Sequence, residues 1–266
     1  GATIGGGGGG SSLKNQVTAN YGTVAGGRAG TAGSFAAVGG GNGNTASGSM
    51  SVVGGGQTNT ASGQNAVVGG GTGNTSTNSS TTVAGGSGND ATGSVATIAG
   101  GLSNEASGDR SAVGGGNINV ASGANATIPG GGVNVAAGDY SFAAGFRAQA
   151  NHNGAFVWAD DAGQDFASTA AKQFLIRAGG GVGIGTDNPQ EALDVAGTAQ
   201  VTGFKLPTGA SSGYVLTTDA NGVGTWQAAS VGGDSDWTIT GNDMSSGVTG
   251  NVGVGTGTPS EKLDVA

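Results

Sequence analysis

Residues able to do covalent chemistry are scarce in this sequence. His152 is the only histidine and there is no cysteine, so any Ser–His–Asp triad would have to use His152, which lies between two asparagines in an expected loop. Zinc would find almost no ligands, because it prefers Cys, His and carboxylate groups. No Gly-Lys-Ser/Thr phosphate loop follows the many glycine motifs. We therefore expect a non-enzymatic protein with no cofactor, no catalytic residue and no metal ligand.

Two groups of side chains leave binding chemistry open. Ca²⁺ takes oxygen ligands, and three aspartates lie close together in the sequence: Asp160, Asp161 and Asp165. Their spacing does not match an EF-hand loop, and solvated turn acids are the alternative. Three tryptophans could stack on sugars or pack in a core or between chains: Trp158, Trp226 and Trp237.

Composition narrows the class of protein. The chain has 266 residues, of which 62 are glycine, and only 9% are charged, against about 25% in average domains. A net charge of −8 makes nucleic acid and anionic membrane surfaces poor partners. No apolar run is long enough to cross a bilayer, so we expect no direct membrane insertion in this segment. The chain starts without Met, and we expect it to be a segment of a longer protein.

A repeat with a period of fifteen organises the first half of the chain. Each unit carries a β-branched anchor, which we expect to form the core: Val38, Val53, Val68, Val83, Ile98, Val113 and Ile128. Six positions after each anchor lies an asparagine: Asn44, Asn59, Asn74, Asn89, Asn104, Asn119 and Asn134. A glycine follows two positions after each anchor and a small residue eight after it. Such a register indicates stacked structural units.

A unit of this length is too short for a helical hairpin, and the glycine content disfavours helix. The repeat predicts an all-β fold, a parallel β-solenoid (β-roll) with two short strands and two glycine turns per coil. Stacking would place the asparagines about 4.8 Å apart, where their amides can form a structural ladder. The alternatives are a ligand-binding role, or positive-φ turn positions that face water.

The thin core of each coil indicates an oligomer. One Val or Ile and one or two Ala per coil contribute little burial against the entropy of ordering the whole coil. Flanking positions add apolar or β-branched surface that could face another chain: Val52, Val67, Thr82, Thr97 and Thr127. We therefore expect self-association, although this reasoning does not set the number of chains.

Three regions follow one another in the sequence. The repeat occupies residues 1–139, with an expected protruding loop at 11–16. An aromatic-rich stretch at 140–180 is expected to cap the last coil, because a solenoid must close its final hydrophobic layer. Residues 181–266 are predicted to form a stalk of short strands with glycine turns. In this region the segment 182–196 recurs as 252–266.

The repeat resembles a known family. Asn65-Ala66-Val67-Val68-Gly69 and Asp109-Arg110-Ser111-Ala112-Val113-Gly114 are similar to the head repeats of trimeric autotransporter adhesins (YadA-like). The resemblance covers about residues 20–150 and implies homotrimers of left-handed parallel β-rolls. The coils of that family are usually one position shorter than the coils of this chain. Residues 181–266 resemble stalk modules of phage tail fibres and of bacterial surface proteins that precede an endosialidase-type chaperone domain.

These observations predict a structural and adhesive segment of an extracellular homotrimeric fibre that mediates surface attachment. Its expected location is a cell surface or a virion surface. Its expected partners are two further copies of itself and a glycan or protein receptor on a host or cell surface. The alternative is a tail fibre of a bacteriophage, or of a phage-like injection system, that binds a host receptor. A glycan hydrolase on a β-helix would need clustered acids, which the repeat lacks.

Overall fold

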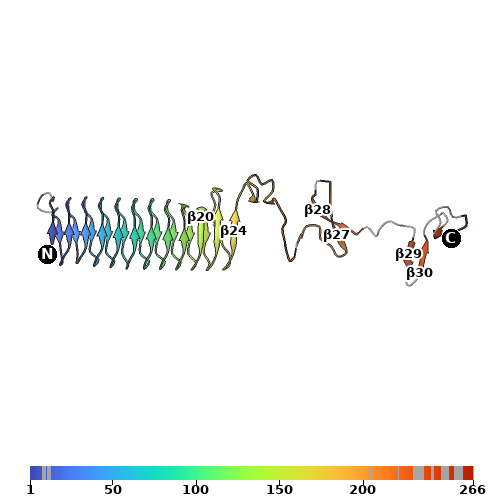
Figure 1. The fold of residues 1–266 in the computed structure, drawn as a ribbon, viewed down its shortest axis with the longest axis horizontal. Coiled ribbons are helices and arrows are strands. Elements are labelled where there is room, and N and C mark those ends of the chain that lie inside the picture. The colour runs from blue at the N-terminus through green and yellow to red at the C-terminus, as the bar shows by residue number, and fades with distance from the viewer. Residues whose placement is uncertain are drawn as a thin grey trace. The chain divides into compact units, whose positions relative to one another are not determined.

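The computed structural model of residues 1–266 describes the whole chain except residues 8–9, 11–12, 204, 221, 230–236, 241–242, 247–251, 255–259 and 266. The fold is all-β, and no helix occurs among the described residues. Its main body is a parallel β-solenoid of about 12 turns with ~15-residue coils (Figure 1). The fold class predicted from the repeat is confirmed.

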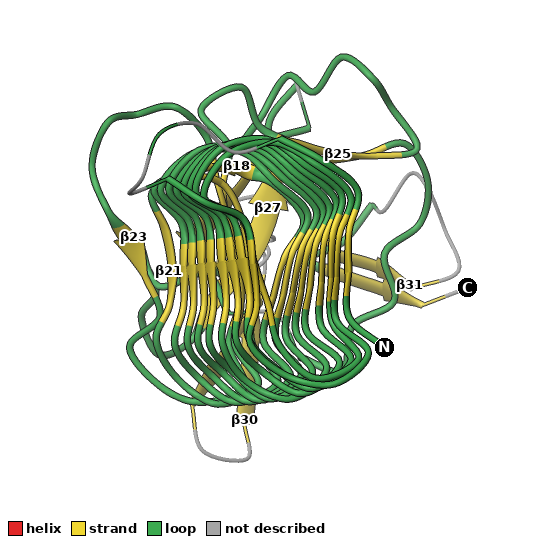
Figure 2. Ribbon diagram, turned by 90° about the vertical axis from the view of Figure 1, so that its left-hand side faces the viewer, coloured by secondary structure: helices red, strands yellow, loops and turns green. Residues whose placement is uncertain are grey.

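Two parallel sheets run along the solenoid, and each coil contributes one strand to each of them. The first, named sheet A here, contains β1 (Thr3–Ile4), β3 (Thr23–Val24), β5 (Ala37–Val38), β7 (Val52–Val53), β9 (Val67–Val68), β11 (Thr82–Val83), β13 (Thr97–Ile98), β15 (Ala112–Val113), β17 (Thr127–Ile128), β20 (Phe142–Phe146), β22 (Phe156–Ala159) and β24 (Phe174–Arg177), with β18 (Gly131–Gly132) beside β20. The second, sheet C, contains β2 (Gln16–Val17), β4 (Thr31–Ala32), β6 (Thr45–Ala46), β8 (Thr60–Ala61), β10 (Thr75–Ser76), β12 (Asp90–Ala91), β14 (Glu105–Ala106), β16 (Val120–Ala121), β19 (Val135–Ala136), β21 (Ala148–Ala150) and β23 (Phe166–Ala167). Figure 2 looks along the stack and shows the two columns of strands joined by superimposed turns.

The strands of the regular coils are so short that each has one inward and one outward side chain. In sheet A, Val52 pairs with Val67 and Val53 pairs with Val68. Val53 and Val68 are fully buried, whereas Val52 is 39% exposed. A third line of isolated parallel bridges runs along the corner between the sheets, through residues such as Asn42, Gln57 and Thr72. Every regular coil is therefore bonded to the next along three lines.

The core is a narrow column of small apolar side chains between the sheets. All the predicted anchors are 0–1% exposed, and they are stacked along sheet A: Val38, Val53, Val68, Val83, Ile98, Val113 and Ile128. Alanines of sheet C such as Ala61 and Ala91 lie opposite them and are also fully buried. Because the anchors are the largest of these side chains, the core of each coil is thin.

One corner of each coil accepts only glycine. Gly86 has a φ of +91°, and a Cβ there would overlap the carbonyl oxygen of Gly101 in the next coil. The equivalent glycines, Gly41, Gly56, Gly71, Gly101 and Gly116, share this positive φ and a close approach of the same kind. Adjacent coils can therefore come into hydrogen-bonding distance at this corner only because the residue there has no side chain.

The aromatic-rich stretch continues both sheets. Its strands β20, β22 and β24 extend sheet A, and β21 and β23 extend sheet C. The regular spacing between successive strands of sheet A is lost here, since Phe142 pairs with Phe156 and Phe156 pairs with Phe174. The inward positions of these strands are filled by Ala143, Val157 and the partly buried Leu175.

The first coil corrects one expectation. Residues 11–16 were expected to protrude as a loop, but Asn15 is 9% exposed and Gln16 begins strand β2. The Asn15 side chain donates to the carbonyls of Gly6 and Gly27 and accepts the N–H of Gly30. The sequence pattern missed Asn15 because its equivalent in the next coil is Gly30, which breaks the asparagine spacing. Residues 11 and 12 lie outside the described part of the chain.

The chain divides into two compact units, Gly1–Gly197 and Thr198–Ala266. In the first unit, β25 (Val182–Ile184) pairs in parallel with β26 (Leu193–Val195). The second unit contains the antiparallel hairpins of β27 (Tyr214–Thr218) with β28 (Gly224–Ala228) and of β29 (Trp237–Thr240) with β30 (Asp243–Ser246). It also contains β31 (Val252–Val254), which pairs in parallel with β32 (Leu263–Val265). The two copies of the stalk repeat thus form equivalent strand pairs, with Val182 opposite Leu193 and Val252 opposite Leu263.

Candidate functional site: the asparagine column, the outer faces and the corners

The repeated asparagines form a buried column next to the hydrophobic core. Their exposed fractions are 0–1% from Asn44 to Asn134. None of them has a positive φ, in contrast to Asn65 and Asn125 at a different corner of the coil. The column therefore does not consist of turn positions that face water, and its amides must find partners inside the protein.

Asn104 shows how these amides are satisfied. Its Nδ2 donates to the carbonyl of Gly100 at 3.0 Å, to the carbonyl of Gly116 at 3.0 Å and to Oδ1 of Asn89 at 3.0 Å. Its Oδ1 accepts the backbone N–H of Asn119 at 3.0 Å and the Asn119 Nδ2 at 3.1 Å. Most of these bonds link one coil to a neighbouring coil, so each asparagine fastens successive turns together.

The direct amide-to-amide bonds occur in only part of the column. They join Asn74, Asn89, Asn104, Asn119 and Asn134 in sequence. The bond from the backbone N–H of one asparagine to the side-chain oxygen of the preceding one runs through the whole column, and it is the only one of the two between Asn44, Asn59 and Asn74. The bonds to glycine carbonyls are present throughout, and the sequence pattern had not predicted them. One of these carbonyls lies four positions before the asparagine and the other lies in the next coil.

His152 is paired with a buried serine. Its Nδ1 lies 2.9 Å from Oγ of Ser168, which is itself 4% exposed and accepts the backbone N–H of Asn151. Among the residues that the structure describes, no carboxylate bonds to this imidazole. The pair ties the turn at 151–153 to strand β23, because Ser168 directly follows that strand.

Two of the three aspartates after β22, Asp160 and Asp165, are bound by arginines. Asp160 Oδ1 accepts from Arg177 Nε at 2.8 Å, and its Oδ2 accepts the N–H of Gly179. The Gly179 N–H and the Arg177 guanidinium lower the pKa of Asp160 below its usual range. Asp165 pairs with Arg147 at 2.8 Å. The described residues contain no group of three or more His, Cys, Asp or Glu side chains that could hold a metal ion.

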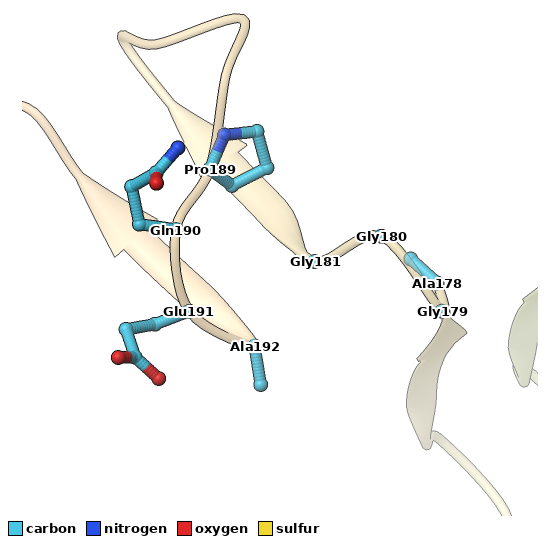
Figure 3. Close-up of a pocket in the computed structure, with 8 residues that line it drawn as sticks. All are labelled: Ala178, Gly179, Gly180, Gly181, Pro189, Gln190, Glu191 and Ala192. Carbon is cyan, nitrogen blue, oxygen red and sulfur yellow. The ribbon is translucent and has the colours of Figure 1, made fainter.

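Pockets among the described residues lie where the regular coils have ended. The first, of about 290 Å³, lies between residues 178–181 and 189–192. Figure 3 shows that one side of it is the backbone of three successive glycines, Gly179, Gly180 and Gly181, and that the Glu191 carboxylate points away from them. The second pocket, in the second unit, has a volume of about 320 Å³ and lies beside Trp226, whose Nε1 donates to the carbonyl of Leu206. Neither pocket has several polar side chains converging on it, which a small-molecule site normally requires.

The outer face of sheet A carries no charge along its entire central column. The outward residues in register are Thr23, Ala37, Val52, Val67, Thr82, Thr97, Ala112, Thr127, Phe142, Phe156 and Phe174. Sheet C differs, because its outward column contains Asp90 beside Glu105. Burial first, and repulsion by Glu105 second, raise the pKa of Asp90.

This uncharged face ends in an aromatic patch. The rings of Phe142 and Phe156 are stacked at 4.6 Å, and those of Phe156 and Phe174 at 4.4 Å. Trp158 and Ile176 form a second outward column beside them and are both 38% exposed. Of the other tryptophans named above, Trp226 lines the pocket beside Leu206, and Trp237 belongs to β29, where its side chain lies outside the described part.

A third feature is a corner at which the backbone is left-handed without glycine. This corner column consists of Tyr21, Phe35, Met50, Asn65, Ser80, Val95, Arg110, Asn125 and Tyr140, with φ between 55° and 60°. A left-handed conformation costs an L-residue roughly 1–2 kcal/mol, and a β-branched residue such as Val95 is a clear outlier. No signal in the sequence marks this corner, because most of these residue types normally avoid a left-handed φ.

Comparison with known proteins adds no assignment, because no protein-family model and no curated protein matches this chain. Among the described residues, no helix is long and apolar enough to cross a membrane. Function is therefore inferred from the faces and corners of the solenoid.

Proposed function

We propose that this chain is a structural and adhesive segment of an extracellular homotrimeric fibre, without enzymatic activity, in which the outer face of sheet A packs against neighbouring copies. The observation that carries this proposal is the uncharged outward column of sheet A, which passes from Thr23 to Phe174 and ends in the aromatic patch. Three copies and a surface location follow from the resemblance to trimeric adhesin heads.

This face is continuous along the solenoid. The strands of this column, at their usual spacing, give a strip about 50 Å long. Its centre holds Val, Thr, Ala and Phe, whose removal from water costs little free energy. Charged side chains would be costly to bury, and they are depleted at the centres of protein interfaces.

The thin core gives a reason for assembly. Each regular coil buries one Val or Ile and a few alanines, and full burial of one such aliphatic side chain contributes about 1.5–3 kcal/mol. Covering the partly exposed Val52, Val67 and Thr97 would add apolar burial to every coil. A receptor would then be contacted by the surfaces that the assembly leaves uncovered.

Light scattering of the purified protein tests the assembly, and the expected mass is that of three chains of 24.7 kDa. A double variant of sheet A, Val67→Lys with Thr97→Lys, should lower the mass to that of one chain, because charges would be buried at the interface. The matched control is Thr45→Lys with Thr75→Lys on sheet C, whose two positions are also separated by two coils, and it should stay assembled. A folded monomeric wild type, or equal behaviour of the two double variants, would contradict the proposal.

A further inference from the structure

The two N-terminal aromatic residues of the corner column lie side by side on the solenoid surface. Tyr21 and Phe35 are 58% and 57% exposed. Their ring centroids are 4.9 Å apart, with an angle of 19° between the ring planes. The stacked pair forms an exposed aromatic patch at a convex corner between sheet C and sheet A, in which each ring covers one face of the other.

The fold does not require side chains at this corner. Both residues have a left-handed φ, 60° for Tyr21 and 55° for Phe35, which glycine adopts without strain. Glycine is available throughout this chain, and it occupies other corners wherever the next coil approaches closely. Large rings retained in a strained, exposed position indicate a role in contacts outside the chain, because strain of this kind concentrates at functional positions.

The surroundings of the pair are polar and uncharged. Asn20 and Ser34 immediately precede the two rings, and Asn20 is exposed. The backbone carbonyl of Asn20 accepts the N–H of Phe35, whereas the Asn20 side chain makes no hydrogen bond within the described residues. The corner column has no charged residue before Arg110.

We propose that Tyr21 and Phe35 form a binding platform for a neutral sugar ring of a surface glycan, with Asn20 and Ser34 bonding its hydroxyl groups; this proposal rests on the adhesive function proposed above. The C–H face of a pyranose is apolar and packs on a flat aromatic ring, while its hydroxyls need amide and hydroxyl partners. An anionic sugar is disfavoured, because the chain has a net charge of −8 and the platform has no cation. A protein partner is also disfavoured, since a convex corner offers no pocket for a buried anchor residue.

Assembly would multiply this site. Each chain of a homotrimer carries one Tyr21–Phe35 platform, so a trimer would present three to a multivalent glycan. Once one platform has bound, the other two are held near the same glycan at a high effective concentration. The overall affinity of the trimer therefore exceeds that of one platform. This explains how an exposed platform without a pocket can serve adhesion.

Retention on agarose beads that carry galactose, glucose or N-acetylglucosamine tests the proposal. The wild-type protein should be retained by at least one of the three bead types and eluted by the same free sugar. The double variant Tyr21→Ala with Phe35→Ala should lose retention at least about tenfold. Tyr140→Ala is the matched control, because Tyr140 lies in the same column with a φ of 56° and is exposed, but has no stacked aromatic partner among the described residues. Unchanged retention of the double variant, or no retention of the wild type on any bead, would overturn the proposal.

Two further measurements separate this site from a structural role. Phe35→Gly should bind less while its melting temperature stays equal or rises, because glycine relieves the backbone strain; a clear fall would show that the ring serves the fold. The double variant should keep the mass of the wild type, and a lower mass would assign the pair to the assembly face and overturn sugar binding. A wild-type monomer that still binds a sugar bead would contradict the trimer alone, whereas a trimer that no bead retains would contradict the platform alone.

Discussion

The regular coils at residues 36–139 and the aromatic turns at 140–177 belong to the same two sheets but obtain their order differently. In the regular coils, the asparagine column bonds successive turns from inside, and the spacing of the strands is constant. In the aromatic turns, the column has ended and the spacing of sheet A strands first shortens, from Phe142 to Phe156, and then lengthens, from Phe156 to Phe174. There, stacked Phe rings and two arginine–aspartate pairs hold the turns from outside.

The asparagine column accompanies the constant spacing but does not by itself set the length of the coil. The Asn104 Nδ2 reaches the carbonyls of Gly100 and Gly116, and its Oδ1 reaches the N–H of Asn119 one full coil later. Asn134 makes the equivalent bonds to the Gly145 carbonyl and the Ala148 N–H across a coil that is one position shorter. Where the column is interrupted at Gly30, the coil that joins Val24 to its partner Val38 is one position shorter than the regular coils. The regular spacing is lost again after the last asparagine of the column.

The largest expected effect comes from the glycine corner of the regular coils. Gly86→Ala should destabilise the protein by at least about 3 kcal/mol, because its Cβ would overlap the Gly101 carbonyl and displace an acceptor of the Asn89 amide. Gly85→Ala is the neighbouring control: a Cβ there meets nothing within 4 Å, and its effect should stay within about 1 kcal/mol. Urea unfolding of the two variants measures the difference, and similar midpoints would show that close packing of the corner is unimportant.

The next effect concerns the column itself. Asn104→Ala should lower the free energy of unfolding by about 2–4 kcal/mol, because the buried N–H of Asn119 loses its acceptor and two glycine carbonyls lose a donor. Asn104→Asp should be worse at neutral pH, since it buries a charge without a cation.

The control for the column is Asn65→Gly, at an exposed corner position with φ +57°, where little change is expected. Thermal melts of the three variants provide the measurement. A neutral Asn104→Asp would contradict an internal column of bonded amides.

The smallest effects are two opposite dependences on pH. The pKa of Asp160 is lowered by the Gly179 N–H and Arg177, so its charged form stabilises the fold above the ordinary value of 3.8 and this contribution is lost as pH falls through the folded pKa. The pKa of Asp90 is raised by burial and then by Glu105, so its charged form costs stability at neutral pH and the cost disappears as pH falls below 3.8.

Two single variants measure this contrast by urea unfolding at about pH 7 and about pH 3. Asp160→Asn should lower stability at neutral pH, and Asp90→Thr, which restores the threonine found one coil earlier at Thr75, should raise it. Both differences should shrink in acid. The same sign of change for the two variants at neutral pH would contradict the contrast between the aromatic end and the regular coils.

Sequence alone determined the regular part of this protein. A strict period in Val53, Asn59 and their equivalents is sufficient to predict parallel strands in register, buried anchors and stacked amides, because identical coils can stack in only one register that keeps every anchor inside. The same reasoning failed at Asn15, whose partner position holds Gly30, since a period cannot be recognised where a repeat lacks its marker residue.

Only the tertiary structure decided which surfaces the coils present and how their corners are bonded. The carbonyls that accept the asparagine amides belong to glycines of the same coil and of the next one, and such backbone partners leave no trace in side-chain pattern. The left-handed conformation of Tyr21 and Phe35 is likewise invisible in the sequence, because these residue types normally avoid it. Stacking of Phe142, Phe156 and Phe174 depends on coils of unequal length, which the neighbouring turns determine through space rather than through sequence spacing.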